Sequence, residues 1–278
     1  QGTVYLPTTV TTLTIKDVGE GQKVITQVMD NASNAKDVND TISVTNGLTL
    51  YSATQVKVSN SNIEVIVDDS NKIDYSATND QYVAVGTNVT IDKSASKWAG
   101  TVVTTDNAVK HGENQSSFQV NGKDKIYVLG AYQVNLDGVT ATYDSGKKAV
   151  SSGDFVQVNT VLKLTAEATK GDTVMQAPTG TGRTGAEIAS ASSYTLSSNL
   201  NAAAGVKVTF GSDIQSVRTE AGGNVVSGTC VLSGTVLQVT ASNSTHTVGA
   251  DGDATVGETS DGVASVTVGV ESTEISAS

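Results

Sequence analysis

Apolar and polar residues alternate along most of this chain, and one alternating stretch recurs in it. Residues 155–166 alternate, break at Asn159 and alternate again, and residues 230–241 repeat that layout. Residues 82–91 are a looser copy and residues 17–26 are the weakest one. A period of two residues places successive side chains on opposite faces of a β-strand. Each copy therefore predicts a strand, a turn and a second strand.

The turn residues of the four copies indicate a repeat of domain size. Gly21, Gly86, Asn159 and Gly234 are 65, 73 and 75 positions apart. Such a period is too long for one coil of a solenoid and fits one small β-domain per repeat. The alternative is two or three larger sandwiches, with the weak first copy a coincidence. We expect four tandem β-sandwich units, at residues 1–70, 71–134, 135–202 and 203–278.

Turn chemistry predicts hairpins between several of the short strands. Asn46 and Gly47 separate alternating runs at residues 41–45 and 48–51, and Asn-Gly between such runs is a strong hairpin signal. A second hairpin is expected between residues 117–120 and 125–129, and a further short strand at residues 55–58.

The repeat also extends upstream of the recurring stretch. Residues 138–143 match residues 205–210, with a shared glycine, alternation and a terminal aromatic residue. Only residues 186–191 suggest a short helix, and no segment has an apolar stripe of 3.6-residue period and helix length. The expected fold class is all-β, built of small sandwiches or barrels.

A similar segment that begins and ends with glycine precedes each of the two best copies of the alternating stretch. Residues 146–153 and 223–228 each run from a glycine through a short apolar stretch to Ser-Gly, before the alternating strand, the turn residue and a Leu-x-Leu-Thr-Ala-like end. This layout resembles the tandem immunoglobulin-like repeats of bacterial cell-surface and surface-layer proteins. The resemblance implies extracellular, Ig-like β-sandwich domains that serve as stalks, surface-layer subunits or adhesin arms. The chain lacks a cell-wall sorting motif, which leaves the mode of anchoring open.

Composition and charge narrow the partners. Aromatic residues make up 4% of the chain and charged residues 16%, so the core must consist of aliphatic side chains and Thr methyl groups, which suit strands. The net charge of −11 repels nucleic acid and anionic membranes. No apolar run reaches the roughly 18 residues that a membrane-spanning helix needs. We therefore expect neither a nucleic-acid partner nor a membrane span.

Carboxylates gather in a glycine-rich stretch near the C-terminus. Asp251 and Asp253 are two positions apart, and Glu258 and Asp261 follow. Hard cations need several oxygen ligands at short range. These four residues are the candidate ligands of a calcium ion, with a solvated turn as the alternative reading. No other cofactor is expected.

Residues that carry most enzyme chemistry are scarce. His111 and His246 are the only histidines, and neither has a His partner at metal-binding spacing. Cys230, the only cysteine, has the inward position of a predicted strand, where a small buried hydrophobe is expected. Residues 180–185 match G-x-G-x-x-G but lack the strand before and the helix after that a phosphate loop requires. We expect no enzyme.

The expected function is therefore that of a non-enzymatic extracellular structural protein, such as a surface-layer, stalk or filament subunit. Self-association with neighbouring copies is expected, by strand donation from residues 1–15 or 263–275, because both ends have the strand pattern. The alternative is a ligand- or glycan-binding adhesin segment that uses Trp98 or the loop at residues 106–116. Trp98 would then be an exposed stacking face, whereas packing beneath a loop is the other reading.

Overall fold

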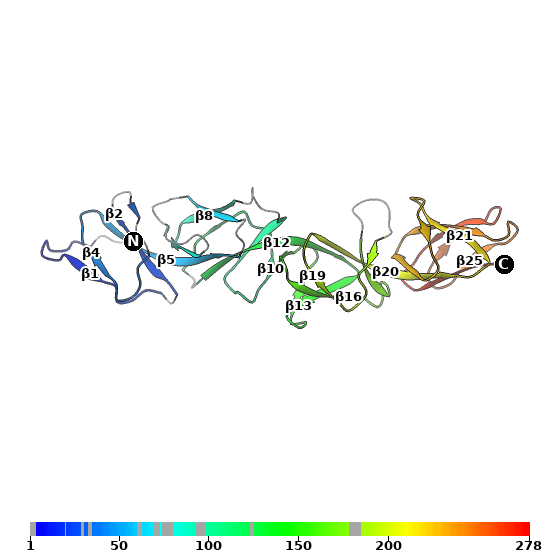
Figure 1. The fold of residues 1–278 in the computed structure, drawn as a ribbon, viewed down its shortest axis with the longest axis horizontal. Helices are drawn as coiled ribbons and strands as arrows, with labels where there is room; N and C mark the ends of the chain where they lie inside the picture. The colour runs from blue at the N-terminus through cyan, green and yellow to red at the C-terminus, as the bar shows by residue number, and fades with distance from the viewer. Residues whose placement is uncertain are drawn as a thin grey trace. The chain divides into compact units, whose positions relative to one another are not determined.

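The computed structural model describes residues 4–19, 21–28, 31–32, 35–59, 63–68, 73, 80–92, 98–122, 125–177 and 185–278. Throughout these residues the regular structure is β-strand, and no helix occurs among them (Figure 1). The all-β prediction is confirmed. The short helix expected at residues 186–191 is wrong, because Ala186 and Glu187 form a strand that pairs with residues 175 and 176.

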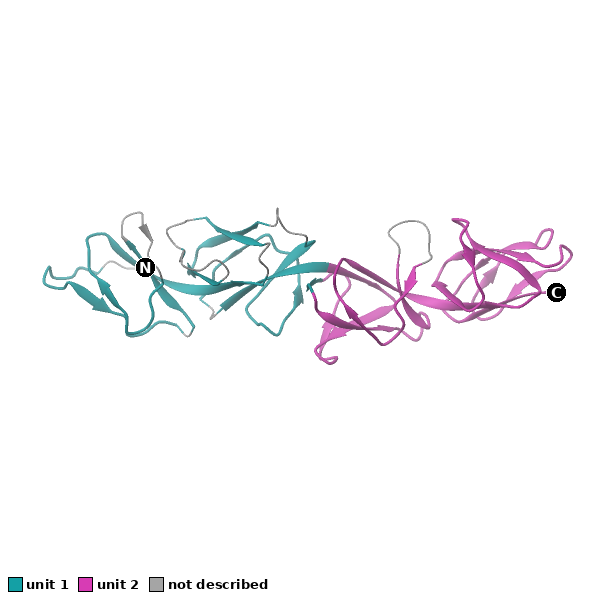
Figure 2. Ribbon diagram, in the orientation of Figure 1, with its two compact units in different colours: residues 1–132, 155–158 teal, residues 133–154, 159–278 magenta. Residues whose placement is uncertain are grey.

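The chain divides into two compact units (Figure 2). Unit 1 comprises residues 1–132 and 155–158, and unit 2 comprises residues 133–154 and 159–278. The division between Tyr132 and Gln133 falls inside one continuous strand, β12. The finer division into four units stays a prediction from the sequence.

Three of the described strands are much longer than the others, and each continues from one structural part of the chain into the next. They are β5 (Leu48–Val58), β12 (Lys125–Asp137) and β20 (Leu200–Phe210). The middle of β12 and of β20 is buried at successive positions, from Val128 to Ala131 and from Ala202 to Val206, and buried positions alternate with less buried ones only toward the strand ends. The sequence predicted two short strands at residues 48–51 and 55–58, but these form the single strand β5.

One set of strand pairings occurs three times along the chain. In each repeat, the second half of a long strand opens the repeat. It pairs in parallel with the strand that closes the repeat, and antiparallel with a short strand. The closing strand pairs antiparallel with another short strand. In the first repeat β5 opens and β12 closes, with β7 (Asp80–Ala84) beside the opening strand and β9 (Gly100–Thr104) beside the closing strand. In the second repeat β12 opens and β20 closes, with β15 (Phe155–Gln157) and β17 (Thr173–Gln176) in these places. In the third repeat β20 opens and β28 (Thr273–Ala277) closes, with β23 (Thr229–Leu232) and β25 (Val248–Ala250) in these places.

A second sheet accompanies each repeat and also has a recurring order. Its central strand lies between two antiparallel neighbours in every case. The central strands are β8 (Asn88–Asp92), β16 (Val161–Ala166) and β24 (Val236–Ala241), and their neighbours are β6 (Glu64–Val67) with β11 (Ser117–Gln119), β13 (Val139–Tyr143) with β19 (Ser192–Thr195), and β21 (Ile214–Thr219) with β27 (Val263–Thr267). Short edge strands complete the sheets: β10 (His111–Gly112), β14 (Lys148–Val150), β18 (Ala186–Glu187), β22 (Asn224–Val225) and β26 (Thr255–Val256).

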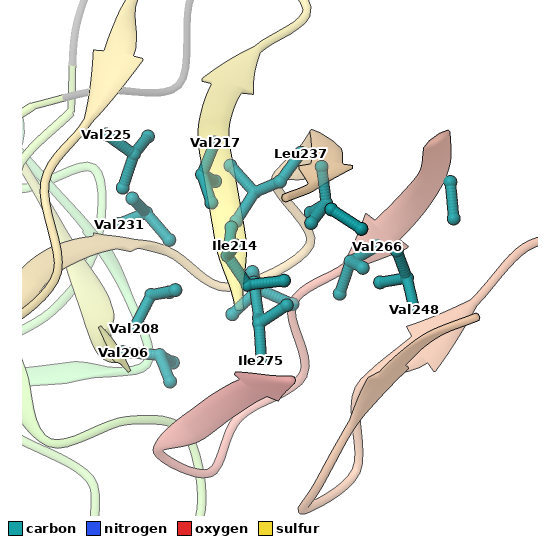
Figure 3. Close-up of a cluster of buried hydrophobic side chains, with 14 residues drawn as sticks. Val206, Val208, Ile214, Val217, Val225, Val231, Leu237, Val248, Val266 and Ile275 are labelled. Atoms are coloured by element: carbon teal, nitrogen blue, oxygen red, sulfur yellow. The ribbon is translucent and has the colours of Figure 1, made fainter. Parts of the chain in front are cut away.

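The core of the third repeat lies between its two sheets (Figure 3). Val208 and Ile275 come from the sheet that contains β20 and β28, and Val217, Leu237 and Val266 come from the other sheet. All five side chains are buried. The first repeat has an equivalent cluster, to which β5, β6, β8 and β12 contribute. Apolar faces of two sheets thus cover each other, as in a β-sandwich.

The part before the first repeat is smaller. β1 (Thr12–Thr14) pairs with β4 (Thr41–Ser43), and the first half of β5 pairs with β2 (Lys23–Val28), whose end pairs with β3 (Asn31–Ala32). Among the residues that the structure describes, its buried cluster consists of Ile15, Val24 and Ile42, with Val18 and Leu48 packed against them. We call residues 4–53 the N-terminal segment.

Both predicted hairpins are wrong. Asn46 and Gly47 do form a turn, with Gly47 at φ 80°, but the strands on either side belong to different sheets. Likewise, β11 pairs with β8, whereas β12 pairs with β5 and β9. At both places the chain therefore passes from a strand of one sheet to a strand of another sheet.

Two details of the predicted repeat also differ from the structure. Residues 138–143, predicted to match residues 205–210, contribute β13 and have the pairing of β21 instead. Residues 205–210 correspond to the second half of β12. Gly86, Asn159 and Gly234 separate equivalent pairs of strands, and all three have positive φ. Gly21 also has positive φ, but the strand that follows it, β2, pairs with the first half of β5 and is not equivalent to the strands that follow the other three turns.

Candidate functional site

The four predicted calcium ligands lie in three different places of the third repeat. Asp251 and Asp253 share one turn, where Asp253 faces the residues before β28 and Asp251 faces Glu274 within β28. Glu258 is exposed after β26, and Asp261 lies in the turn before β27. Among the described residues, no three His, Cys, Asp or Glu side chains lie close enough to hold a metal ion. The calcium site stays a prediction from the sequence.

Asp253 acts as an acceptor for backbone N–H groups. Val270 N donates to its Oδ2 at 2.9 Å, and Glu271 N donates to its Oδ1 at 3.1 Å. These two hydrogen bonds favour the charged carboxylate and lower the pKa of Asp253. Gly269 has no room for a Cβ, which would meet the same carboxylate. The residues before β28 are thereby fixed against the Asp253 turn.

Three further aspartates bind the closing strand or the residue before it, two by accepting backbone N–H groups and one by accepting a serine hydroxyl. Glu274 N donates to Asp251 Oδ1 and Ala277 N donates to Asp213 Oδ2. Ser272 Oγ donates to Asp172 Oδ2 at 2.7 Å. Two of the four residues that the sequence marked as cation ligands, Asp251 and Asp253, thus belong to a set of carboxylates that hold the last strand and the residues just before it. Sequence spacing could not show this, because Asp172 and Asp213 lie far from Asp251 in the chain.

The residues with nucleophilic or acid–base chemistry are dispersed. Cys230 packs against the cluster of Met175, Ala203 and Leu232, but it is half-buried and not fully buried as the sequence predicted. Burial, and then the negative charge of Glu187, raises the pKa of its thiol, so the reactive thiolate is disfavoured at neutral pH. His111 lies in unit 1 and His246 in unit 2. The predicted Gly-rich loop at residues 180–185 lies outside the described residues except for Gly185.

Trp98 packs against the protein instead of forming an open stacking face. Its ring forms an edge-to-face pair with Tyr132, with ring centroids 5.6 Å apart. Trp98 Cδ1 lies 2.8 Å from the place where a Cβ on Gly130 would be, so only glycine allows this packing. The side chain also contacts the core of the first repeat. The structure therefore favours the reading in which the Trp98 ring is packed against the protein over the one in which it is an exposed stacking face.

Unit 2 contains a pocket of about 430 Å³. Asn135 and Asn201 lie along it, and Asn135 Nδ2 donates to Asn201 Oδ1 at 2.8 Å. Asp137, Lys170 and aliphatic side chains such as Leu232 complete the lining. The lining also includes Ser233, but no histidine or cysteine is among the described lining residues.

The recurring feature of greatest functional interest is the parallel pair in each repeat. Val56 lies opposite Ile126, Val134 opposite Leu200, and Val208 opposite Thr273. These registers are equivalent, because each valine has the same place in its opening strand. The signal in the sequence is a short one that our reading missed: Gln-Val-x-(Val/Leu) at residues 55–58 and 133–136, with Lys-Val-x-Phe at residues 207–210.

Comparison with known proteins found no matching family model, no similar curated protein and no similar solved structure. Within the described residues, no helix is long and apolar enough to span a membrane.

Proposed function

We propose that this chain is a non-enzymatic structural protein that transmits tension through tandem β-repeats. The observation that carries the proposal is the parallel pairing of the first and last strand in every repeat. The two ends of a repeat are the start of its opening strand and the end of its closing strand. Tension applied to these ends acts along two paired strands in opposite directions.

The direction of tension decides how the hydrogen bonds of a strand pair share it. When parallel strands are pulled from opposite ends, they slide past each other, and all bonds of the pair are strained together. When two strands are pulled from the same end, the bonds break one after another. A bond of a few kcal/mol gives little resistance alone, so simultaneous loading gives a much higher unfolding barrier.

Continuity of the long strands supports the proposal in a second way. β12 closes the first repeat and opens the second, and β20 closes the second and opens the third. No linker residues separate a closing strand from the next opening strand. Tension therefore passes along an extended backbone without first straightening a loop.

The proposed setting is extracellular, in a surface layer, stalk or filament, with Ig-like repeats as the resemblance implies. Support comes from the tandem sandwich-like sheets and from the low content of charged and catalytic side chains. The aspartates that hold β28 fit the same role, because they bind the strand at which tension leaves the last repeat.

Single-molecule pulling on the two ends of the chain tests the proposed function. We expect discrete unfolding events, each of which releases the contour length of one repeat, about 25 nm for ~70 residues. The rate of unfolding under force governs the peak height, so a series of pulling speeds gives the barrier. Extension without resolved peaks would contradict a tension-bearing function.

A further inference from the structure

The described residues of the N-terminal segment do not include a strand that every repeat contains. Ser52 aligns with Gly130, because the Ser52 carbonyl accepts the Val85 N–H at 2.8 Å just as the Gly130 carbonyl accepts the Val158 N–H at 3.0 Å. The first half of β5 is thus a closing strand, and β2 lies beside it as β9 lies beside β12. Within the described residues, no opening strand pairs in parallel with residues 48–50.

The missing strand leaves Leu50 exposed. Since Ser52 is equivalent to Gly130, Leu50 is equivalent to Val128, two residues earlier. The registers of the parallel pairs show that Ala202 and Ile275 have the same position in the other closing strands. Leu50 is 45% exposed, whereas Val128 is 0%, Ala202 2% and Ile275 1% exposed. The same position is buried in all three repeats that have an opening strand.

Backbone geometry shows which edge is open. In an antiparallel pair, successive residues direct their N–H and C=O groups to alternate sides. The Ser52 carbonyl faces away from β2, toward Val85. Leu50, two residues earlier, therefore directs its own N–H and C=O away from β2, to the side where an opening strand lies in the repeats.

A short segment of the same chain has the pattern of an opening strand. Val4, Tyr5 and Leu6 match the apolar-x-apolar pattern of residues 56–58 and 134–136. Val4 is 78% and Tyr5 92% exposed, and neither belongs to a strand. Pro7 follows and has no N–H, which ends a possible ladder after three residues, as expected for a strand this short.

We propose that residues 4–6 of one copy of this chain pair in parallel with residues 48–50 of a second copy. The register of the repeats places Val4 opposite Leu48 and Leu6 opposite Leu50. Each chain has both the donor and the acceptor, and we take the exchange to be reciprocal, which gives a closed, symmetric dimer. None of the six paired positions is charged, so the contact itself avoids like-charge repulsion. The proposal goes beyond tension transmission and does not depend on it.

Light scattering coupled to size exclusion tests the dimer with the whole chain. We expect a dimer for the native sequence, and monomers for Leu6→Asp on the donor and for Leu50→Asp on the acceptor. Val226→Asp, at a valine that is 70% exposed in unit 2, is the matched control and stays dimeric. Thermal unfolding by circular dichroism verifies that each variant is folded. A monomeric native chain, or a dimer that persists in both folded donor and acceptor variants, would overturn the proposal.

Cysteine crosslinking tests the register and the source of the strand. In a Cys230→Ser background, a Leu6→Cys chain and a Leu50→Cys chain are mixed under mild oxidation. Paired positions on neighbouring strands lie within the Cα separation that a disulfide spans, so we expect a crosslinked heterodimer. Val226→Cys mixed with Leu50→Cys should not crosslink. If the chain with both Leu6→Cys and Leu50→Cys crosslinks only within itself, the strand closes on its own chain and the second copy is excluded.

Discussion

Val134 lies directly opposite Leu200 in the parallel pairing of β12 with β20. Both side chains are fully buried, and they come from the two ends of the second repeat. Val56 with Ile126 repeats this relationship in the first repeat. In these two repeats, buried core residues thus also form the contact between the first and last strands. Core packing and the proposed resistance to tension therefore depend on the same residues.

Truncating the side chain at equivalent positions should destabilise a complete repeat more than it destabilises the N-terminal segment. Val128→Ala removes buried methyl groups from the first repeat and should destabilise it by about 2 kcal/mol. Leu50→Ala changes the equivalent, exposed position and should cost the dilute monomer under about 0.5 kcal/mol. Urea unfolding of the two variants measures the difference. Equal losses would show that residues 48–50 are already covered in the monomer.

The Asp253 carboxylate should make the third repeat sensitive to acid. Its pKa is lowered in the folded state by the N–H groups of Val270 and Glu271. The stabilisation is therefore present above the unfolded-state pKa, about 3.9, and is lost as the pH falls through the lower folded-state value. Asp253→Asn should lower the unfolding temperature at pH 7, and the difference from the native chain should shrink in strong acid.

Glu258→Gln is the control for this charge effect, since it removes an exposed carboxylate of the same repeat. It should leave the unfolding temperature near that of the native chain at both pH values. A loss of stability in Asp253→Asn that is equally large in strong acid would show that the carboxylate charge has no part in the effect.

Calcium should have little effect on the stability of the third repeat. Asp251 and Asp253 already accept N–H groups of the residues before and within β28, and a cation would compete for those oxygens. We expect the same unfolding temperature with calcium and with a chelator. A rise that grows with calcium concentration, as mass action requires for a ligand of the folded state, and that Asp253→Asn abolishes, would instead establish the predicted site.

The sequence predicted the class of structure but not its connections. Alternation located many of the short strands, and Gly86, Asn159 and Gly234 have the positive φ that their turns require. The parallel pairs were missed because they join residues far apart in the chain, such as Val56 and Ile126. Alternation of apolar and polar residues identifies a strand but not the strands with which it pairs. A turn signal such as Asn46-Gly47 does not show whether the strands on either side belong to the same sheet.

The candidate site was predicted in its residues but not in their role. Asp251 and Asp253 stood out because carboxylates two positions apart in a glycine-rich loop suit a cation. Their hydrogen bonds to Glu274 and Val270 depend on how β28 returns past the same turn. That return is set by the parallel pairing with β20, which local sequence does not reveal.

Pulling the second repeat in two directions tests the central claim most directly. In a Cys230→Ser background, handles at Gln133→Cys and Lys207→Cys load the parallel pair from opposite ends, whereas handles at Gln133→Cys and Ser198→Cys load it from one end. We predict a severalfold higher unfolding force for the first geometry at the same pulling speed. Asn135→Pro, which removes an N–H from the opening strand, should lower only that higher force. Equal forces in the two directions would contradict the account.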